Sequence, residues 1–365
     1  MNGSLVEKIA DAVLYEGYIL YPYRPSAVKN QQRWNFGALC PECYSLAKNG
    51  TESWTMQTEC LVRQSDETIL NIKVRFLHLV SREVGKRVAD CRLPVVDCGH
   101  IEIGTEGSTS HFELVSSLEV NGRVFQTWQE AIERDGALLA SIIGDKVESN
   151  EQRFSFPYDE TRELLVDDAS GETMGVILRK QQAIEGIIDV KTAEIILGSA
   201  DINESPLKIT VKILNLTPFE DARERSRDEA LMRSFVSTHT ILEVEKGEFI
   251  SLLDPPEPFR DFASKCHNVG TYPVLVGEEG TRDCMLSSPI ILYDYPQIAP
   301  ESAGNLYDGT EIDEILTLRI MTLTEEEKRE MRGADARARQ ILERTETLPM
   351  EQLLKMHGAM KGVKS

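Results

Sequence analysis

Two stretches of this chain alternate apolar and polar residues, and this alternation is the feature that most limits the fold. Apolar or small side chains recur at every second position in 54–62 and again in 70–78. A period of two places such side chains on one face of a β-strand. The polar run 64–68 lies between the stretches and predicts a turn joining two strands. The sequence therefore predicts a β-rich body.

Asn121-Gly122 marks a hairpin, because this dipeptide is the strongest short signal for a two-residue turn. The flanking segments 112–120 and 123–128 are the predicted strands. Thr127 with Glu130 has capping-box spacing and predicts a short helix directly after the hairpin.

The second half of the chain resembles the first. Segment 72–79 matches 209–216 with apolar on apolar, and 118–122 matches 242–247, at offsets of about 124–137 residues. The order is the same in both halves, which predicts an internal duplication. The alternative is that unrelated half-buried strands look alike because they share one period.

We therefore expect an α+β, β-dominated fold with two duplicated antiparallel, sandwich-like units and a C-terminal helical tail. The expected domains are a β-rich unit with a leading helix at 1–140, a second β-rich unit at 141–323, and the tail at 324–365. An acidic connector, 145–205, holds 14 acidic and 6 basic residues.

Three helical regions have recognisable ends. Ser4 with Glu7 predicts the start of the leading helix, and Thr324 with Glu327 predicts a helix in the tail. Pro349 suits the first turn of a last helix. Segment 221–233 predicts a charged helix inserted in the second unit.

Charge and composition exclude several classes of protein. The 60 acidic residues outnumber the 40 basic ones, which gives a net charge of −20 and disfavours nucleic-acid binding. The longest apolar run, 137–143, is too short to span a bilayer, and the N-terminus lacks the pattern of a secretory signal. Seven scattered cysteines suit a reducing compartment. We expect a cytoplasmic protein that binds neither nucleic acid nor membrane.

An unusual basic and aromatic segment, 17–48, carries a net charge of +3 on this acidic chain. It mixes aromatic rings, guanidinium groups and amides, a composition typical of protein-contact hot spots. The predicted partner-binding residues are Tyr21, Tyr23, Arg24, Lys29, Arg33 and Trp34. The alternative is a loop whose rings pack beneath it and whose cations pair with the acidic body.

An acidic loop, 308–314, is the second predicted partner surface, through Asp308, Glu311 and Asp313. Its oxygens lack the order of a calcium loop. Thr310 with Asp313 also suits the start of a helix.

Cys40 and Cys43 have the two-residue gap of a zinc knuckle. Further ligands would have to come from Cys91, Cys98 or His100, although the spacing of those residues is wider than usual. We therefore expect no cofactor and two ordinary thiols at this position; a zinc site at this pair is the first alternative and a redox pair is the second.

Other candidate sites carry less information. Cys266-His267, Cys284 and His239 could form a thiol nucleophile with a base, but nothing in the local sequence specifies this. His78 aligns with Asn215 in the repeat, which suggests a hydrogen-bonded or solvent-facing position. Glycine-rich phosphate loops are absent from the sequence, so an ATP or dinucleotide enzyme has no support.

Three motifs carry a family resemblance: LYEGYILYPYRPSAVKNQQRWNFG, SLLDPPEP, and SSPIILYDYPQIAPESAGNLYDGTEIDEILTLR followed by LTEEEK. The chain resembles an uncharacterised bacterial family encoded beside nickel–iron hydrogenases and their maturation factors. The family brings no established catalytic residues. The resemblance implies an accessory or assembly role for a cytoplasmic metalloenzyme.

We therefore expect a non-catalytic adaptor or assembly factor that contacts a hydrogenase subunit or maturation factor. The first alternative is a metal-handling or hydrolytic enzyme that uses Cys40 and Cys43 or a cleft between the two units. The second alternative is a structural scaffold subunit.

Overall fold

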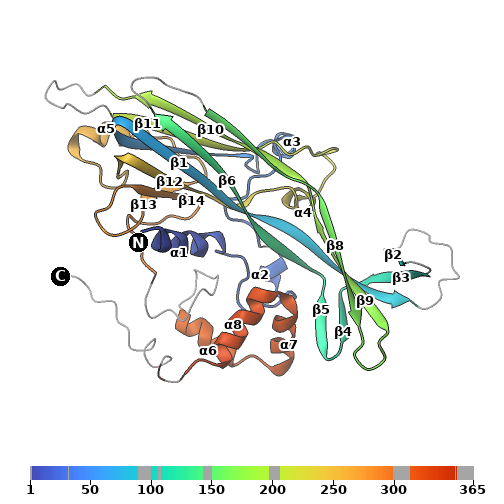
Figure 1. Ribbon diagram of the computed structural model, residues 1–365. Coiled ribbons are helices and arrows are strands. Elements are labelled where there is room, and N and C mark those ends of the chain that lie inside the picture. The colour runs from blue at the N-terminus through green and yellow to red at the C-terminus, as the bar shows by residue number, and fades with distance from the viewer. Residues whose placement is uncertain are drawn as a thin grey trace.

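The computed structural model describes residues 2–31, 33–88, 100–105, 108–142, 150–196, 206–298, 313–349 and 351. Strands predominate over helices in this part of the chain (Figure 1). The helices are α1 (Asn2–Leu14), α2 (Val28–Gln31), α3 (Glu42–Ala47), α4 (Arg227–Leu231), the 3₁₀ turn η1 (Glu257–Phe259), α5 (Arg260–Ala263), α6 (Asp313–Met321), α7 (Glu325–Ala334) and α8 (Ala336–Glu346). The strands are β1 (Thr55–Val88), β2 (His100–Thr105), β3 (Ser108–Val115), β4 (Ser117–Val120), β5 (Arg123–Gln126), β6 (Trp128–Ile142), β7 (Asn150–Phe156), β8 (Asp159–Val166), β9 (Thr173–Gln181), β10 (Ile184–Glu194), β11 (Pro206–Asn215), β12 (Val236–Ile250), β13 (Tyr272–Leu275) and β14 (Cys284–Ser288).

Strand β1 organises the molecule. Its 34 residues pair in turn with β11, β6 and β3 along one edge and with β12 and β9 along the other. Among the described residues, twelve strands form one antiparallel sheet, and β4 with β5 forms a separate hairpin. In Figure 1 the long strands run together along one diagonal, and α1 and the C-terminal helices lie on one side of them.

The two faces of β1 contribute to different hydrophobic cores. Ile72, Val74 and Phe76 are buried in a cluster with residues of β10, β11 and β12. Leu77 and Leu79 belong to a second cluster, which includes the N-terminal aromatic segment and α6–α8. Burial of each such side chain contributes about 1.5–3 kcal/mol. Alternation along one strand thus stabilises packing on both sides of the sheet.

The predicted turn at 64–68 is wrong, because these residues lie inside β1. Gln64 pairs with Gly247 and Ile69 pairs with Glu245, so β1 has several extra residues opposite Lys246. A bulge absorbs extra residues without reversing the strand. The polar run is therefore an irregularity in one long strand.

The predicted helix at Thr127 and Glu130 is also wrong. Residues 128–142 form β6, which pairs with β1 in an unbroken ladder from Arg82↔Trp128 to Thr68↔Ile142. The long ladder of backbone hydrogen bonds overrides a local capping preference.

Several local predictions are confirmed. The hairpin β4–β5 turns at Asn121-Gly122, whose φ angles of 52° and 71° are those of a type I′ turn. Thr324 accepts a hydrogen bond from the Glu327 backbone and forms a capping box for α7. The charged helix predicted in 221–233 is the short α4, which begins after Ser226. The last helix, predicted near Pro349, falls almost wholly outside the described residues.

The predicted duplication is not confirmed. Segment 72–79 of the first copy lies inside the long strand β1, whereas its match, 209–216, falls mostly on the shorter strand β11. Asn121-Gly122 turns a hairpin, whereas Lys246-Gly247 lies within β12. Strands from 1–140 and from 141–323 share one sheet, so the division into two sandwich-like units stays a prediction.

Three helices, α6–α8, do follow the sheet. None of the described helices has the length and apolar character needed to cross a bilayer.

Candidate functional site

The basic and aromatic segment packs largely inward. Tyr23 is 0% exposed, Trp34 is 5% exposed and Arg33 is 4% exposed. These side chains therefore pack against the chain's own body, which matches the alternative that the sequence left open. Lys29 is exposed and stays available to a partner.

Arg33 lies between two indole rings. Its guanidinium carbon is 4.3 Å from the ring centroid of Trp34 and 3.6 Å from that of Trp128. Burial lowers the pKa of Arg33 to about 10, and the charges of Tyr18 and Asp335 oppose that change. Stacking on aromatic faces compensates part of the lost hydration of a buried cation.

Two further residues of the segment contact the C-terminal helices. Arg24 forms an ion pair of 3.1 Å with Glu327 on α7. The guanidinium of Arg319 on α6 lies 5.3 Å from the ring centroid of the half-buried Tyr21. The predicted partner surface is thus mainly an internal contact between the two ends of the chain.

Two residues of the predicted acidic surface, Asp308 and Glu311, lie outside the described residues, and so does Thr310. Asp313 is the first residue of α6.

The two cysteines of the predicted zinc knuckle lie in different environments. Cys40 is fully buried, and burial raises the pKa of its thiol. Cys43 is exposed, and its Sγ donates to the carbonyl of Phe219 at 3.4 Å. Cys91 and Cys98 lie outside the described residues. Within the described ranges, no group of three or more His, Cys, Asp or Glu residues is arranged to hold a metal.

Three of the thiol and histidine candidates, Cys266, Cys284 and His239, have pKa values unsuited to nucleophilic catalysis. Burial raises the pKa of Cys266 to about 11 and that of Cys284 beyond the usual thiol range. Burial lowers the pKa of His239 to about 4, and that of His78 to about 4. At neutral pH these thiols are protonated, whereas the thiolate is the nucleophile.

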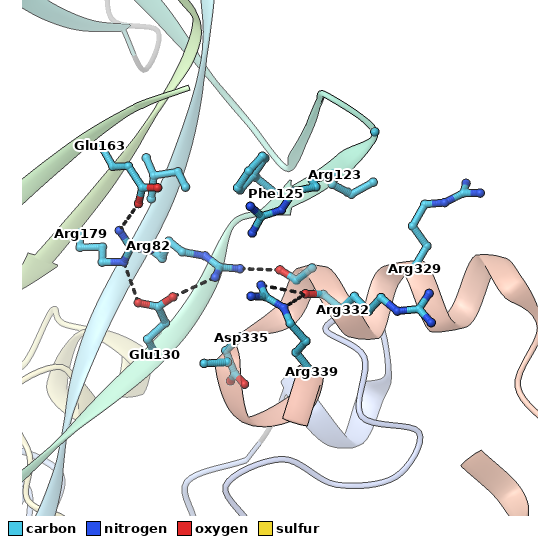
Figure 2. Close-up of a pocket in the computed structure, with 15 residues that line it drawn as sticks. Arg82, Arg123, Phe125, Glu130, Glu163, Arg179, Arg329, Arg332, Asp335 and Arg339 are labelled. Atoms are coloured by element: carbon cyan, nitrogen blue, oxygen red, sulfur yellow. Dashed lines mark hydrogen bonds and ion pairs between the residues drawn. The ribbon is translucent and has the colours of Figure 1, made fainter. Parts of the chain in front are cut away.

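The structure brings together a group of residues that the sequence analysis did not select. A pocket of about 660 Å³ lies between the end of the sheet, the hairpin β4–β5 and helices α7 and α8 (Figure 2). The close approach of α7 to β5 depends on Gly333, because a Cβ at that position would lie 2.6 Å from the carbonyl oxygen of Val124. The hairpin and the helix thus form two walls of one hollow.

Arginine dominates the lining of this pocket, which we call the arginine pocket. Three carboxylates also line it, from Glu130, Glu163 and Asp335, as do the apolar side chains of Phe125 and Ile177. Its arginines are Arg82, Arg123, Arg179, Arg329, Arg332 and Arg339.

Ion pairs fix the inner arginines. Arg82 donates from Nη1 to Glu130 at 2.8 Å, from Nε to the carbonyl of Gln126 at 2.9 Å and from Nη2 to the carbonyl of Gly333 at 3.0 Å. Arg179 lies between Glu130 and Glu163, at 2.9 Å from each. Arg82 thereby ties strand β1 to the C-terminal end of α7.

The outer arginines have fewer anionic partners. Arg332 pairs with Glu346 at 2.9 Å, whereas Arg339 donates to the carbonyl of Arg332, at 3.3 and 3.4 Å. The guanidinium carbon of Arg123 lies 5.3 Å from the ring centroid of Phe125, and Figure 2 shows it turned back toward Arg82.

The sequence analysis missed this pocket because its residues come from β1, β5, β6, β8, β9, α7 and α8. The one local signal was the basic run in 328–339, which interrupts a strongly acidic chain.

A second feature is the exposed segment 289–298, which follows β14. Ile290 and Leu292 pack against the cluster that contains α1, whereas Ile291 is 73% exposed and Tyr293 is 86% exposed. Alternation thus leaves two large apolar side chains on the surface within one of the motifs that carry the resemblance.

Comparisons with known proteins identify no family. No family model and no curated protein matches the chain. Among solved structures, it is similar to the type IV competence pilus secretin PilQ of V. cholerae at 10% identity, over 46% of this chain and 61% of that chain, with a TM-score of 0.09. It is similar to the type II secretion secretin XcpQ of Pseudomonas aeruginosa at 12% identity, over 54% and 61%, with a TM-score of 0.10. The chain thus spans about three fifths of each secretin, and at these TM-scores the likeness carries no argument about fold or function.

Proposed function

We propose that this chain is a non-catalytic cytoplasmic adaptor or assembly factor that contacts another protein of a nickel–iron hydrogenase system. The observation that carries the proposal is the exposure of Ile291 and Tyr293 inside a motif of the family resemblance. Tyrosine is enriched at protein interfaces because it buries a large ring while its hydroxyl stays hydrogen-bonded.

The chemistry of the described residues favours binding over catalysis. The arginine pocket holds fixed cations, and the buried thiols have raised pKa values. Such groups can recognise a ligand or partner, but they do not form an activated nucleophile with its base.

The experiment is affinity purification of the tagged protein from its native host, with mass spectrometry of the recovered partners. The double variant Ile291→Ser/Tyr293→Ala removes the exposed apolar pair. It should recover at least tenfold less of the hydrogenase partner, since interface hot spots contribute about 2 kcal/mol or more. Leu46→Ser on α3 is the matched control, because Leu46 is 65% exposed outside the motif. Equal recovery by wild type and the double variant, with unchanged circular dichroism, would refute the proposed surface.

Metal analysis of the same sample separates the alternatives. Stoichiometric zinc or nickel on the purified chain, lost in Cys43→Ser, would favour a metal-handling enzyme. A fixed ratio of this chain to hydrogenase subunits in the mature complex would favour a scaffold subunit.

A further inference from the structure

We propose that the arginine pocket binds a small ligand that carries two or more oxyanion groups, either phosphate or carboxylate. This proposal is independent of the adaptor role. It rests on three observations: an excess of cations, their fixed geometry and the size of the hollow.

The excess of cations follows from the ion pairs. Glu130 and Glu163 bind Arg82 and Arg179. The third carboxylate, on Asp335, turns to other donors. It accepts from the hydroxyl of Tyr18 at 3.0 Å, from Nε1 of Trp128 at 3.2 Å and from the backbone N–H of Ala338 at 2.8 Å.

Three guanidinium groups therefore have no carboxylate partner among the described residues: those of Arg123, Arg329 and Arg339. Several unneutralised cations around one hollow produce a local positive potential that concentrates anions. The planar guanidinium fork matches two oxygens of a phosphate or carboxylate.

The inner wall of the pocket is held in place before any ligand arrives. Arg82 uses all three of its nitrogens on Glu130, Gln126 and Gly333. A wall of fixed charges needs little ordering on binding, which favours affinity. Among the outer arginines, Arg123 on β5, Arg329 on α7 and Arg339 on α8 have no carboxylate partner in the described part of the chain, and Arg339 would exchange its hydrogen bonds to the carbonyl of Arg332 for those to an anion.

The volume sets the size of the ligand. About 660 Å³ lies within the range of small-molecule pockets, roughly 300–1,000 Å³. The ring of Phe125 and the side chain of Ile177 add an apolar wall. The net charge of the whole chain, −20, disfavours the binding of a long nucleic acid. The pocket therefore suits a compact multivalent anion.

Isothermal titration calorimetry with sodium pyrophosphate and, separately, sodium citrate tests this proposal on the full chain at low salt. We expect at least one of them to bind with one-to-one stoichiometry and to weaken steeply with added salt. Binding of pyrophosphate but not citrate would identify the ligand groups as phosphates. Binding of citrate but not pyrophosphate would identify them as carboxylates.

Two variants locate the binding site. Arg123→Gln/Arg339→Gln should weaken binding at least tenfold. Arg260→Gln, a control on α5 where Arg260 is exposed and pairs with Glu257 at 2.8 Å, should bind as wild type does. Arg123→Lys keeps the charge but loses the planar guanidinium fork, so its affinity should lie between that of wild type and that of the double variant.

Failure of both anions to bind wild type would overturn the proposal. The proposal would also be overturned if wild type and the folded double variant bound the anion equally well. It would be overturned, too, if Arg260→Gln weakened binding as much as the double variant does, because the attraction would then be non-specific. None of these outcomes depends on whether a hydrogenase partner is recovered.

Discussion

The two ends of strand β1 carry different kinds of side chain, although they belong to one continuous backbone. Toward its start and middle, residues such as Ile72 and Phe76 pack among aliphatic and aromatic side chains. Toward its end, Arg82 enters a hollow of ion pairs. Both ends pair with neighbouring strands in antiparallel ladders. The backbone provides the same scaffold at both ends, and only the side chains decide whether a region stabilises the fold or offers charge.

This division separates stability from binding. An apolar core excludes water and stabilises the folded state in proportion to the buried area. A pocket of fixed cations contributes little net stability, since their desolvation offsets much of the Coulomb energy. Substitutions in β1 should therefore destabilise the protein less when they lie near the arginine pocket than when they lie in the apolar core.

The largest effect is expected at the core end. Phe76 is fully buried and contacts three other rings, with centroids at 4.6 Å to Phe235, 5.7 Å to Phe154 and 6.1 Å to Phe156. Phe76→Ala should cost about 3–5 kcal/mol in the free energy of unfolding measured in urea. Leu139→Ala, at a position 71% exposed on β6, is the control and should change it by less than about 0.5 kcal/mol. If Phe76→Ala and Leu139→Ala lowered the free energy of unfolding equally, the distinction between core and surface positions here would be wrong.

The stability that His78 contributes, two residues after Phe76 in β1, should depend on pH. His78 is buried, and burial followed by the charge of Arg134 lowers its pKa from 6.5 to about 4. The unfolded chain therefore binds a proton between these values while the folded chain does not. The contribution of His78 to stability is complete above pH 6.5 and is lost as the pH falls toward 4, by roughly 3 kcal/mol.

Urea unfolding at several pH values checks this expectation. His78→Leu removes the titrating group, so the loss of stability between pH 6.5 and 4 should be smaller than in wild type. The buried His239, whose pKa burial also lowers to about 4, remains and keeps part of the slope. Identical slopes in the two proteins would contradict the assignment.

The smallest effect is expected at the pocket end. Arg82→Met removes hydrogen bonds to Glu130, Gln126 and Gly333 but keeps an unbranched apolar stem in place of the arginine methylenes. Because Glu130 keeps Arg179 as a partner, we expect a loss of about 2 kcal/mol or less in urea unfolding. A loss as large as that of Phe76→Ala would mean that the pocket is a structural core and would remove the contrast between the two ends.

Local chemistry was predicted well where neighbouring residues decide it. Asn121-Gly122 turns a hairpin because these two residues adopt positive φ easily. Thr324 and Glu327 cap a helix because their side chains reach each other's backbone N–H. The predictions failed where distant strands compete. The polar run 64–68 is a bulge and not a turn, and Thr127 with Glu130 belongs to a strand, because pairing with β1 and β12 outweighs local preference.

The candidate sites show the same limit. Arg33 and Trp34 looked like contact residues because composition cannot distinguish a ring that packs inside from one that binds a partner. The ring of Trp128, 95 positions after Arg33, stacks on the guanidinium of Arg33. The arginine pocket could not be found from spacing, because its arginines come from five elements along the chain.

Local patterns thus established that the chain is β-rich and acidic overall, and they located the N-terminal cap of α7 and the turn of the β4–β5 hairpin. These properties depend on backbone preferences and on side chains within a few positions of one another. Tertiary structure alone decided that one strand joins both halves in a single sheet, that the aromatic segment is buried, and that arginines gather beside α7. Those outcomes depend on burial and charge balance between residues far apart in sequence, which no local pattern records.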